Sequence, residues 1–213
     1  MIYDRVLDQL GTAVVDGSFG DGPRSIDELV VRTGASRSIV REAVRVLVGL
    51  GLLRARRRVG VTARPLAEWD VLDPRVVGWR LAGPDRPAVL AELRALRRAV
   101  EPAAAAAAAA RRDDPVGLEA LLAAADRLAS ATGPADATPF LQADRDLHRL
   151  VLERSGNALY ARLHLVVGRA LDERRGIGPD DHDVDLHRAL VQAVVDGDPD
   201  AARRAMQEIV DRT

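Results

Sequence analysis

The sequence predicts a mostly α-helical protein in two parts: three helices with a small β-hairpin, followed by a larger all-helical bundle. Three observations lead to this fold class. Apolar residues recur at helical spacing along most of the chain. Strand-like segments are confined to residues 53–62, and prolines recur between residues 63 and 84. We therefore expect a first domain over residues 1–64, a linker over 65–84 and a second domain over 85–213.

The composition is that of a globular chain without disulfides. Its 213 residues, 47% of them hydrophobic, suffice for one large core or two small ones. The absence of cysteine excludes disulfides and thiolate metal sites. No signal peptide is evident, and no uninterrupted apolar run is long enough to span a bilayer. We therefore expect a soluble, cytoplasmic protein that does not associate with a membrane.

Charge is unevenly distributed along the chain. Residues 1–65 contain eleven arginines and seven acidic residues, whereas residues 66–213 contain twenty arginines and twenty-five acidic residues. The corresponding net charges are +4 and −5. A basic first part attached to an acidic body favours a nucleic-acid-binding module joined to a second domain.

The first three helices have recognisable ends. Residues 2–15 form the first helix, which Asp16-Gly17 ends. Ser25 and Glu28 fit a capping box that opens a second helix, which stops at Gly34. Ser36 is a natural N-cap for the third helix, which presents an apolar stripe at helical spacing. The stripe consists of Val40, Ala43, Val44, Leu47 and Leu50.

The third helix and the hairpin after it are rich in arginine. Arg37, Arg41 and Arg45 recur every fourth residue and therefore share one edge of the helix. Residues 53–62 predict two short strands around a basic turn. Three helices and a basic hairpin predict a winged helix-turn-helix, in which the third helix enters the major groove and the wing lies along the phosphates or minor groove. For the arginine row alone, a solvated basic face is the alternative.

The segment from Gly34 to Leu47, followed by Gly51-Leu52-Leu53, resembles the signature of the GntR family of bacterial transcription regulators. The resemblance implies that the third helix and the wing contact operator DNA, with Gly60 at the wing tip. The sequence departs from the usual family pattern at Gly22-Pro23-Arg24-Ser25 and at Val59. The DNA-binding residues that the resemblance implies are Ser36, Arg37, Ser38, Arg41, Arg45, Arg56, Arg57, Arg58 and Gly60.

From residue 85 onward the sequence predicts only helices, joined as a bundle around a central cavity. Asp114 is an N-cap followed by Pro115 at the first helical position, and Asn157 caps a later helix. The linker contains a short helix at about residues 73–81, and we expect Trp69 and Trp79 to pack the two domains together. The helices expected in the second domain cover residues 87–111, 114–131, 137–155, 157–174, 183–195 and a last segment opened by Asp198-Pro199.

Three residues of the second domain could bind a metal ion. Asp144 and His148 are four residues apart on one helix, so their side chains project from the same face and can share a cation. His187 lies on a later helix. Oxygen and imidazole ligands from two helices suit zinc, nickel, manganese or iron. At this spacing alone, an Asp–His pair is more often a simple hydrogen-bonded pair than a set of metal ligands.

The second domain also resembles the FCD domain, the helical ligand-sensing domain of the FadR-type branch of the GntR family. The resemblance rests on residues 140–148, on Ser155-Gly156-Asn157 and on His187. Many members hold a divalent metal with one aspartate and three histidines, of which Asp144, His148 and His187 match the first three. Ile209 stands at the fourth position, so the resemblance implies either a three-ligand site completed by water or effector, or a degenerate site.

The same resemblance implies an effector-binding residue. Arg97, four residues before Glu101, matches an arginine that points toward the effector cavity. A guanidinium beside a cation suits a carboxylate ligand, whereas the alternative is a salt bridge with Glu101. Residues 68–74 and Trp79 further resemble a subgroup that responds to sugar acids such as galactonate or gluconate.

These features favour a ligand-responsive repressor that senses a small carboxylate, possibly a sugar acid. A palindromic operator requires a two-fold partner, so we expect a homodimer on double-stranded DNA. The first alternative is a metal-dependent hydrolase or lyase with a basic N-terminal module, in which the three metal ligands activate water. The chain has no nucleophile elbow and no phosphate loop, and we therefore expect no enzyme. The second alternative is an architectural DNA-binding dimer without an effector.

Overall fold

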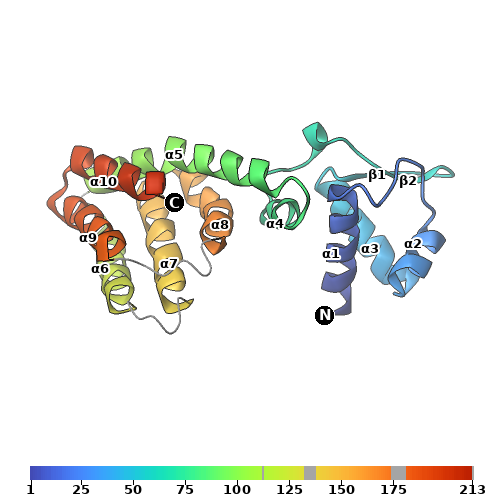
Figure 1. The fold of residues 1–213 in the computed structure, drawn as a ribbon, viewed down its shortest axis with the longest axis horizontal. Coiled ribbons are helices and arrows are strands. Elements are labelled where there is room, and N and C mark those ends of the chain that lie inside the picture. The colour runs from blue at the N-terminus through green and yellow to red at the C-terminus, as the bar shows by residue number, and fades with distance from the viewer. Residues whose placement is uncertain (112, 132–137, 174–180, 213) are drawn as a thin grey trace. The chain divides into compact units, whose positions relative to one another are not determined.

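The fold is mostly α-helical, and the strands in the described parts of the chain form one two-stranded sheet. The computed structural model describes residues 1–111, 113–131, 138–173 and 181–212. The chain divides into two units, Met1–Val89 and Leu90–Thr213, whose helices and strands are labelled in Figure 1. Each unit has buried apolar residues of its own. The expected fold class, a small helical unit with a hairpin followed by a helical bundle, is confirmed.

The helices of the N-terminal unit begin and end where their capping residues lie. The Ser25 hydroxyl accepts a hydrogen bond from the Glu28 N–H at 3.2 Å, and the Glu28 carboxylate accepts one from the Ser25 N–H at 2.6 Å. The expected capping box is therefore confirmed. The Ser36 hydroxyl accepts from the Ile39 N–H and caps the third helix, as expected. The helices are α1 (Ile2–Val15), α2 (Ile26–Thr33) and α3 (Arg37–Gly49).

The hairpin consists of β1 (Leu53–Arg56) and β2 (Gly60–Ala63), which pair antiparallel. The backbone of Arg24 adds a bridge to Val61, with an N–H to carbonyl hydrogen bond of 2.8 Å in each direction. This contact explains why a glycine opens β2. Gly60 has a φ of +118°, and a Cβ there would lie 2.8 Å from the Arg24 carbonyl oxygen.

The linker folds onto the N-terminal unit. It contains a 3₁₀ turn, η1 (Leu66–Glu68), and the expected short helix, α4 (Pro74–Ala82). Trp79 of α4 is buried in the core of this unit, and its indole N–H donates to the Asp8 carboxylate at 3.0 Å. The Trp69 indole donates to the Arg64 carbonyl at 2.8 Å. Both indoles therefore make these hydrogen bonds within residues 1–89, and their packing between two domains stays a prediction.

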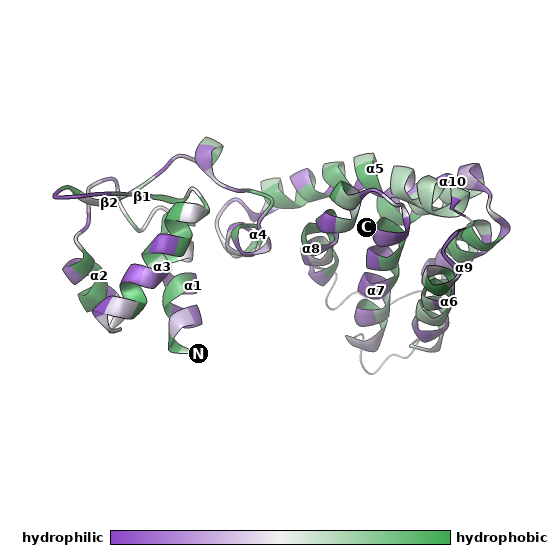
Figure 2. Ribbon diagram, turned by 180° about the vertical axis from the view of Figure 1, so that it is seen from behind, coloured by the Kyte–Doolittle hydropathy of each residue, from purple (hydrophilic) through white to green (hydrophobic). Residues whose placement is uncertain are grey.

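The C-terminal bundle is held together by separate clusters of buried apolar residues, a large one that includes Leu121 and Leu147 and a smaller one that includes Leu152 and Val167. Helix α7 packs between α6 and α8, and α9 packs against α6 and α10. Figure 2 shows that most helices carry both hydrophobic and hydrophilic residues, as helices with one buried face do. No helix in the described residues is long and apolar enough to cross a membrane. The helices are α5 (Arg86–Ala110), α6 (Pro115–Ser130), α7 (Thr138–Arg154), α8 (Ala158–Asp172), α9 (Asp181–Asp196) and α10 (Pro199–Arg212).

Candidate DNA-binding face and buried metal-ligand site

The arginines of α3 and of the hairpin border one groove. It has a volume of about 520 Å³ and lies between α3 and the hairpin, with Arg41 and Arg45 on one side and Arg56 and Arg57 on the other. All four side chains are exposed, and so is Arg58, which adopts a φ of +63° in the turn between the strands. The groove brings together cations that are more than ten residues apart in the sequence.

The exposed arginines differ in their partners. Arg37 forms an ion pair with Asp27 of α2, and Arg45 pairs with Glu42 at 3.3 Å. Within the described residues, the side chain of Arg41 makes no hydrogen bond or ion pair, and the same holds for Arg56, Arg57 and Arg58. Cations without an acidic partner are available to a polyanion.

The other residues expected at this face lie next to the arginines. Ser36 and Ser38 are exposed at the first turn of α3, and their hydroxyl oxygens are 3.1 Å apart. Gly60 is the first residue of β2, directly after the turn of the hairpin, and lines the groove. The apolar stripe of α3 faces the opposite way, into the core of the unit, as the sequence predicts.

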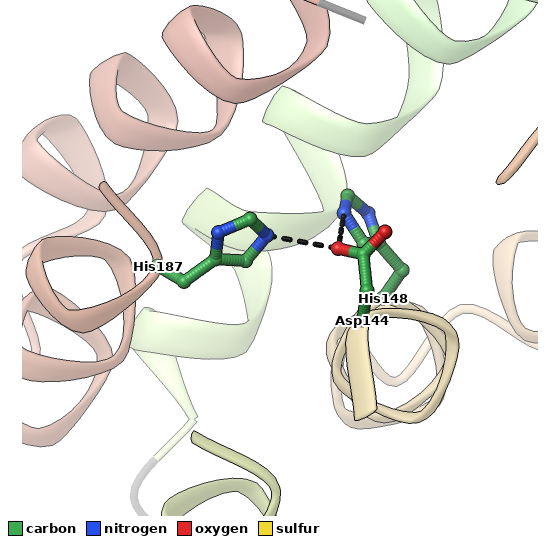
Figure 3. Close-up of side chains that lie close together, drawn as sticks. All are labelled: Asp144, His148 and His187. Atoms are coloured by element: carbon green, nitrogen blue, oxygen red, sulfur yellow. Dashed lines mark ion pairs between the residues drawn. The ribbon is translucent and has the colours of Figure 1, made fainter. Parts of the chain in front are cut away.

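In the C-terminal unit, the three expected metal ligands converge in the interior (Figure 3). Asp144 and His148 lie one turn apart on α7, and His187 reaches toward them from α9. The Asp144 Oδ1 lies 3.4 Å from Nε2 of His148 and 3.0 Å from Nε2 of His187. All three side chains are almost completely buried. A carboxylate oxygen and two imidazole nitrogens thus meet at one point.

The outer nitrogens of both histidines have acceptors. His187 Nδ1 lies 2.6 Å from the carbonyl oxygen of Asp183, which can only accept a hydrogen bond, so Nδ1 carries the proton. His148 Nδ1 contacts the carboxylate of Glu101 on α5. A histidine whose Nδ1–H is held in this way presents Nε2 to a metal ion.

The inner nitrogens fit a cation. Neither His148 Nε2 nor His187 Nε2 makes a hydrogen bond within the described residues, although both are buried. Buried polar atoms without a hydrogen bond are rare and call for a partner. Two such nitrogens that converge on one carboxylate match the nitrogen and oxygen ligand set of zinc or a similar divalent ion.

In the metal-free chain, charge holds these residues together. Burial raises the pKa of Glu101, but His148 and Arg97 outweigh it and lower that pKa to about 2. Burial lowers the pKa of His148, but Glu101 and Asp144 raise it to about 9. Burial also raises the pKa of Asp144, but the imidazoles of His148 and His187 beside it hold that pKa well below its usual range. A proton on His148 therefore supplies part of the positive charge that a metal ion would bring.

Arg97 belongs to the same cluster. Its side chain is 2% exposed, and its Nε donates to Glu101 Oε1 at 2.6 Å. The salt bridge with Glu101 therefore exists and is buried, and the role of Arg97 toward an effector remains a prediction.

Ile209, at the expected fourth-ligand position, is buried in the apolar core. The metal-ligand group found in the described residues consists of Asp144, His148 and His187. His164 lies outside it, with Nδ1 2.7 Å from the Ala161 carbonyl oxygen. Of the two readings that the sequence leaves open, a three-ligand site is the one that this arrangement of side chains favours.

Sequence reasoning missed the two acceptors behind the histidines. Asp183 lies one helical turn before His187, so spacing on α9 could have indicated that contact. Glu101 was considered only as a partner of Arg97. Its contact with His148 joins residues 47 positions apart on different helices, and no local pattern signals such a contact.

Comparisons with known proteins show the family of this chain. The family model described as "FCD domain" matches residues 92–212. The galactonate operon transcriptional repressor of Escherichia coli K12 is 30% identical over 210 residues, which cover 95% of this chain and 90% of that protein. The chain belongs to the GntR family. Its FCD domain places this GntR-family transcription regulator in the FadR-type branch.

Further relatives of this GntR-family regulator support the assignment. The transcriptional repressor NanR of Citrobacter rodentium is 30% identical over 219 residues, covering 97% of this chain and 81% of that protein. Among solved structures, Streptococcus agalactiae GntR has a TM-score of 0.56 at 24% identity, with 98% of this chain and 97% of that chain covered. The Listeria monocytogenes regulator Lar has a TM-score of 0.61 at 15% identity, with 100% and 94% covered. At these identities the two structures support the fold.

Proposed function

We propose that this GntR-family protein is a repressor that binds a palindromic operator as a homodimer and changes its DNA affinity when a small carboxylate binds. The observation that carries the proposal is the pairing of two sites in one chain. The N-terminal unit presents exposed arginines without acidic partners, and the C-terminal unit buries a three-residue ligand group.

The DNA contacts in this proposal follow from the groove of the N-terminal unit. Helix α3 would enter the major groove, where Arg41 and Arg45 reach base edges, while Arg56, Arg57 and Arg58 of the hairpin meet phosphates. Ser36, Ser38 and Gly60, next to these arginines, would contact the backbone of the duplex. Arg37 would have to exchange its ion pair with Asp27 for a DNA contact.

The effector site would be built around Asp144, His148 and His187. These residues would hold a divalent cation: zinc, nickel, manganese or iron. Such an ion, when bound, provides positive charge for a carboxylate. Arg97 would pair with the same carboxylate through its guanidinium. The similarity to the galactonate operon repressor supports a sugar acid as the effector.

The coupling between the two sites requires little energy. A tenfold change in operator affinity corresponds to about 1.4 kcal/mol of difference in effector affinity between two arrangements of the dimer. One charge-assisted hydrogen bond made in only one of those arrangements supplies this amount.

Gel-shift assays at low salt test the proposal. We expect specific binding to the DNA upstream of its own operon, changed by one of a panel of sugar acids with a divalent metal present. A thermal-shift screen of the same panel identifies the effector, because a ligand that binds the folded state raises the melting temperature. Failure to find any effector-sensitive DNA binding would refute the proposal. Turnover of a sugar acid that chelation abolishes would establish the hydrolase or lyase alternative instead.

Replacing Arg41 by alanine tests the DNA-binding face. Arg41 is exposed and without a partner in the described residues, so the fold should remain intact. One base or phosphate contact is worth about 1–3 kcal/mol, and operator affinity should therefore fall about 5- to 150-fold. The matched control is Arg203→Ala, which removes an exposed arginine from α10 in the other unit. Equal affinities for wild type and Arg41→Ala would refute the assigned role.

A further inference from the structure

One buried carboxylate connects two residues to which the proposed function gives different tasks. Glu101 of α5 is 0% exposed. Its Oε1 accepts a hydrogen bond from Nε of Arg97 at 2.6 Å, and its Oε2 contacts Nδ1 of His148 on α7. Both carboxylate oxygens are therefore occupied: one by Arg97, the residue proposed to bind the effector, and one by His148, a proposed metal ligand.

We infer that Glu101 is a positioning residue: it fixes His148 in the tautomer whose Nε2 faces Asp144 and His187, and Arg97 holds Glu101 in place. The inference rests on the proposed metal-binding function. Glu101 itself does not point an atom at the place where the three ligand atoms meet, since both of its oxygens are directed elsewhere.

The chemical argument concerns which nitrogen of the imidazole carries the proton. A neutral imidazole has one N–H, and a carboxylate can only accept a hydrogen bond from it. Glu101 therefore selects the Nδ1–H form, which leaves the Nε2 lone pair for a metal ion. Nε2 lies 3.4 Å from Asp144 Oδ1, on the side where His187 also converges.

The two histidines differ in how their tautomer is fixed. His187 donates to the backbone carbonyl of Asp183 at 2.6 Å, and no side-chain substitution at residue 183 removes that acceptor. His148 depends on a side chain. A change at residue 101 therefore disturbs one ligand and leaves the other two in place, which makes the role of Glu101 measurable.

The isosteric substitution Glu101→Gln is the most direct test. Because Arg97 Nε needs an acceptor, the amide oxygen takes the place of Oε1, and the NH2 group faces Nδ1 of His148. That NH2 group donates to Nδ1 and stabilises the opposite tautomer, with the proton on Nε2. Zinc affinity of the full-length protein, measured by competition with a chromogenic chelator, should fall by about 10–100-fold, as for other partners behind metal-binding histidines. The matched control is Asp172→Asn, the same carboxylate-to-amide change in the Arg145–Asp172 ion pair of this unit. Its zinc affinity should equal that of wild type.

Glu101→Gln also leaves the buried Arg97 without its carboxylate, which could unfold the chain. The double variant Arg97→Gln/Glu101→Gln avoids this, because two amides can hydrogen-bond to each other without a buried charge. We expect the double variant to lose zinc affinity as Glu101→Gln does, and Arg97→Gln alone to keep most of it. The loss should thus follow residue 101 and not residue 97.

A spectroscopic readout separates positioning from mere structural support. The chain has only four histidines, so their ring nitrogens can be followed by NMR after selective ¹⁵N labelling. In the zinc-loaded wild type, His148 should show an Nδ1–H signal protected from exchange, and this signal should be absent from the variants that lack the carboxylate.

The outcomes distinguish this inference from the proposed function on which it rests. The role of Glu101 alone would be overturned if wild type binds zinc and both variants that lack the carboxylate keep the same zinc affinity and the same His148 signal. Absence of binding by wild type to zinc, nickel, manganese and iron would overturn the metal site and the inference together.

Discussion

At the scale of single residues, Arg154 shows how one buried cation joins the ends of several helices. Its guanidinium donates to the carbonyls of Ala108 at 3.2 Å and of Arg111 at 2.6 Å, and to that of Asp114. It also lies 3.2 Å from the Asp114 carboxylate. The last carbonyls of a helix have no partner within that helix. Arg154 of α7 therefore satisfies the end of α5 and anchors the start of α6.

Replacing Arg154 by methionine should destabilise the C-terminal unit. The loss of its hydrogen bonds leaves buried carbonyls unsatisfied, and we expect about 2–3 kcal/mol less free energy of unfolding. Both tryptophans of the chain lie in the N-terminal unit, so their fluorescence reports on that unit, whereas circular dichroism reports on both. Urea denaturation should show the change by circular dichroism only.

The matched control is Arg149→Met on the same helix, where an arginine that is 37% exposed pairs with Glu153 at 2.7 Å. Such an ion pair contributes below about 1 kcal/mol. An equal effect of the two substitutions would contradict the anchoring role of Arg154.

The His148–Glu101 pair predicts how the stability of the metal-free chain depends on pH. Burial opposes both charges, but each partner shifts the other: the pKa of Glu101 falls from 4.5 to about 2, and the pKa of His148 rises from 6.5 to about 9. The contribution of Glu101 to the free energy of unfolding is therefore fully present above pH 4.5, its pKa in the unfolded chain, and is lost as pH falls toward 2. The contribution of His148 to the free energy of unfolding is fully present below pH 6.5 and is lost as pH rises through 9.

With a chelator present, the melting temperature should fall between pH 6.5 and 9, where folded His148 still holds a proton that the unfolded chain has lost. The rise in melting temperature caused by zinc should instead grow with pH over the same range. The reason is that a histidine must lose its proton at the ligating nitrogen before it can bind a metal ion. Asp144→Asn, which removes the shared carboxylate, should abolish the zinc effect. A zinc effect that shrinks with rising pH would contradict this account.

At the scale of elements, the contact between α1 and α4 depends on a glycine. A Cβ on Gly11 of α1 would lie 2.6 Å from ring atoms of Trp79. The indole has no room to retreat, because it is buried and hydrogen-bonded to Asp8. Gly11 therefore lets the linker helix pack closely against the first helix of the DNA-binding unit.

The substitution Gly11→Ala should destabilise the N-terminal unit, although alanine stabilises a helix by about 1 kcal/mol relative to glycine. Steric overlap with Trp79 outweighs that gain, since overpacking typically costs about 1–3 kcal/mol. Gly49→Ala in α3 is the matched control, because a Cβ there meets no atom within 4 Å. Tryptophan fluorescence should report a lower melting temperature for the first variant and an equal or higher one for the second. A stabilised Gly11→Ala variant would contradict the close contact.

The helix starts could be predicted from the sequence wherever a capping residue marks them. Helices α2, α3, α6 and α8 each begin at the residue after an expected N-cap, respectively Ser25, Ser36, Asp114 and Asn157. Helix α9 begins at Asp181, two residues before the expected position, where no capping signal was identified. Capping is a local interaction of residues within one turn, and the sequence displays it directly.

The contacts that build the sites could be predicted only in part. Asp144 and His148 share one helix face, and spacing shows this, whereas spacing cannot show that His187, on a later helix, lies beside them. The contact of Trp79 with Asp8 spans 71 positions and that of Glu101 with His148 spans 47. Such contacts depend on which helices pack against each other. Helical periodicity shows which residues share a face of one helix, but it does not show which other helix packs against that face.

At the scale of the whole molecule, the two units divide the chemistry between them. The N-terminal unit exposes its cations on α3 and the hairpin, whereas the C-terminal unit buries Arg97, Glu101, Asp144, His148 and His187 in its interior. Exposed cations suit a large polyanion whose affinity falls steeply with salt. Buried charges respond to a small ligand or an ion that replaces their partners. This division suits the proposed function, in which one unit binds DNA and the other binds a small ligand.

The last prediction concerns the dimer that palindromic recognition requires. One α3 helix reads a single half-site, so a chain of 22.9 kDa should sediment at about twice that mass in the absence of DNA. Footprinting should show two protected half-sites about one helical turn, roughly 10 base pairs, or a multiple of it apart. Insertion of about 5 base pairs between the half-sites rotates one relative to the other by half a turn, and affinity should fall to that of a single half-site. Sedimentation as a monomer, or affinity that the insertion leaves unchanged, would show that each chain binds alone and would remove the two-fold mechanism.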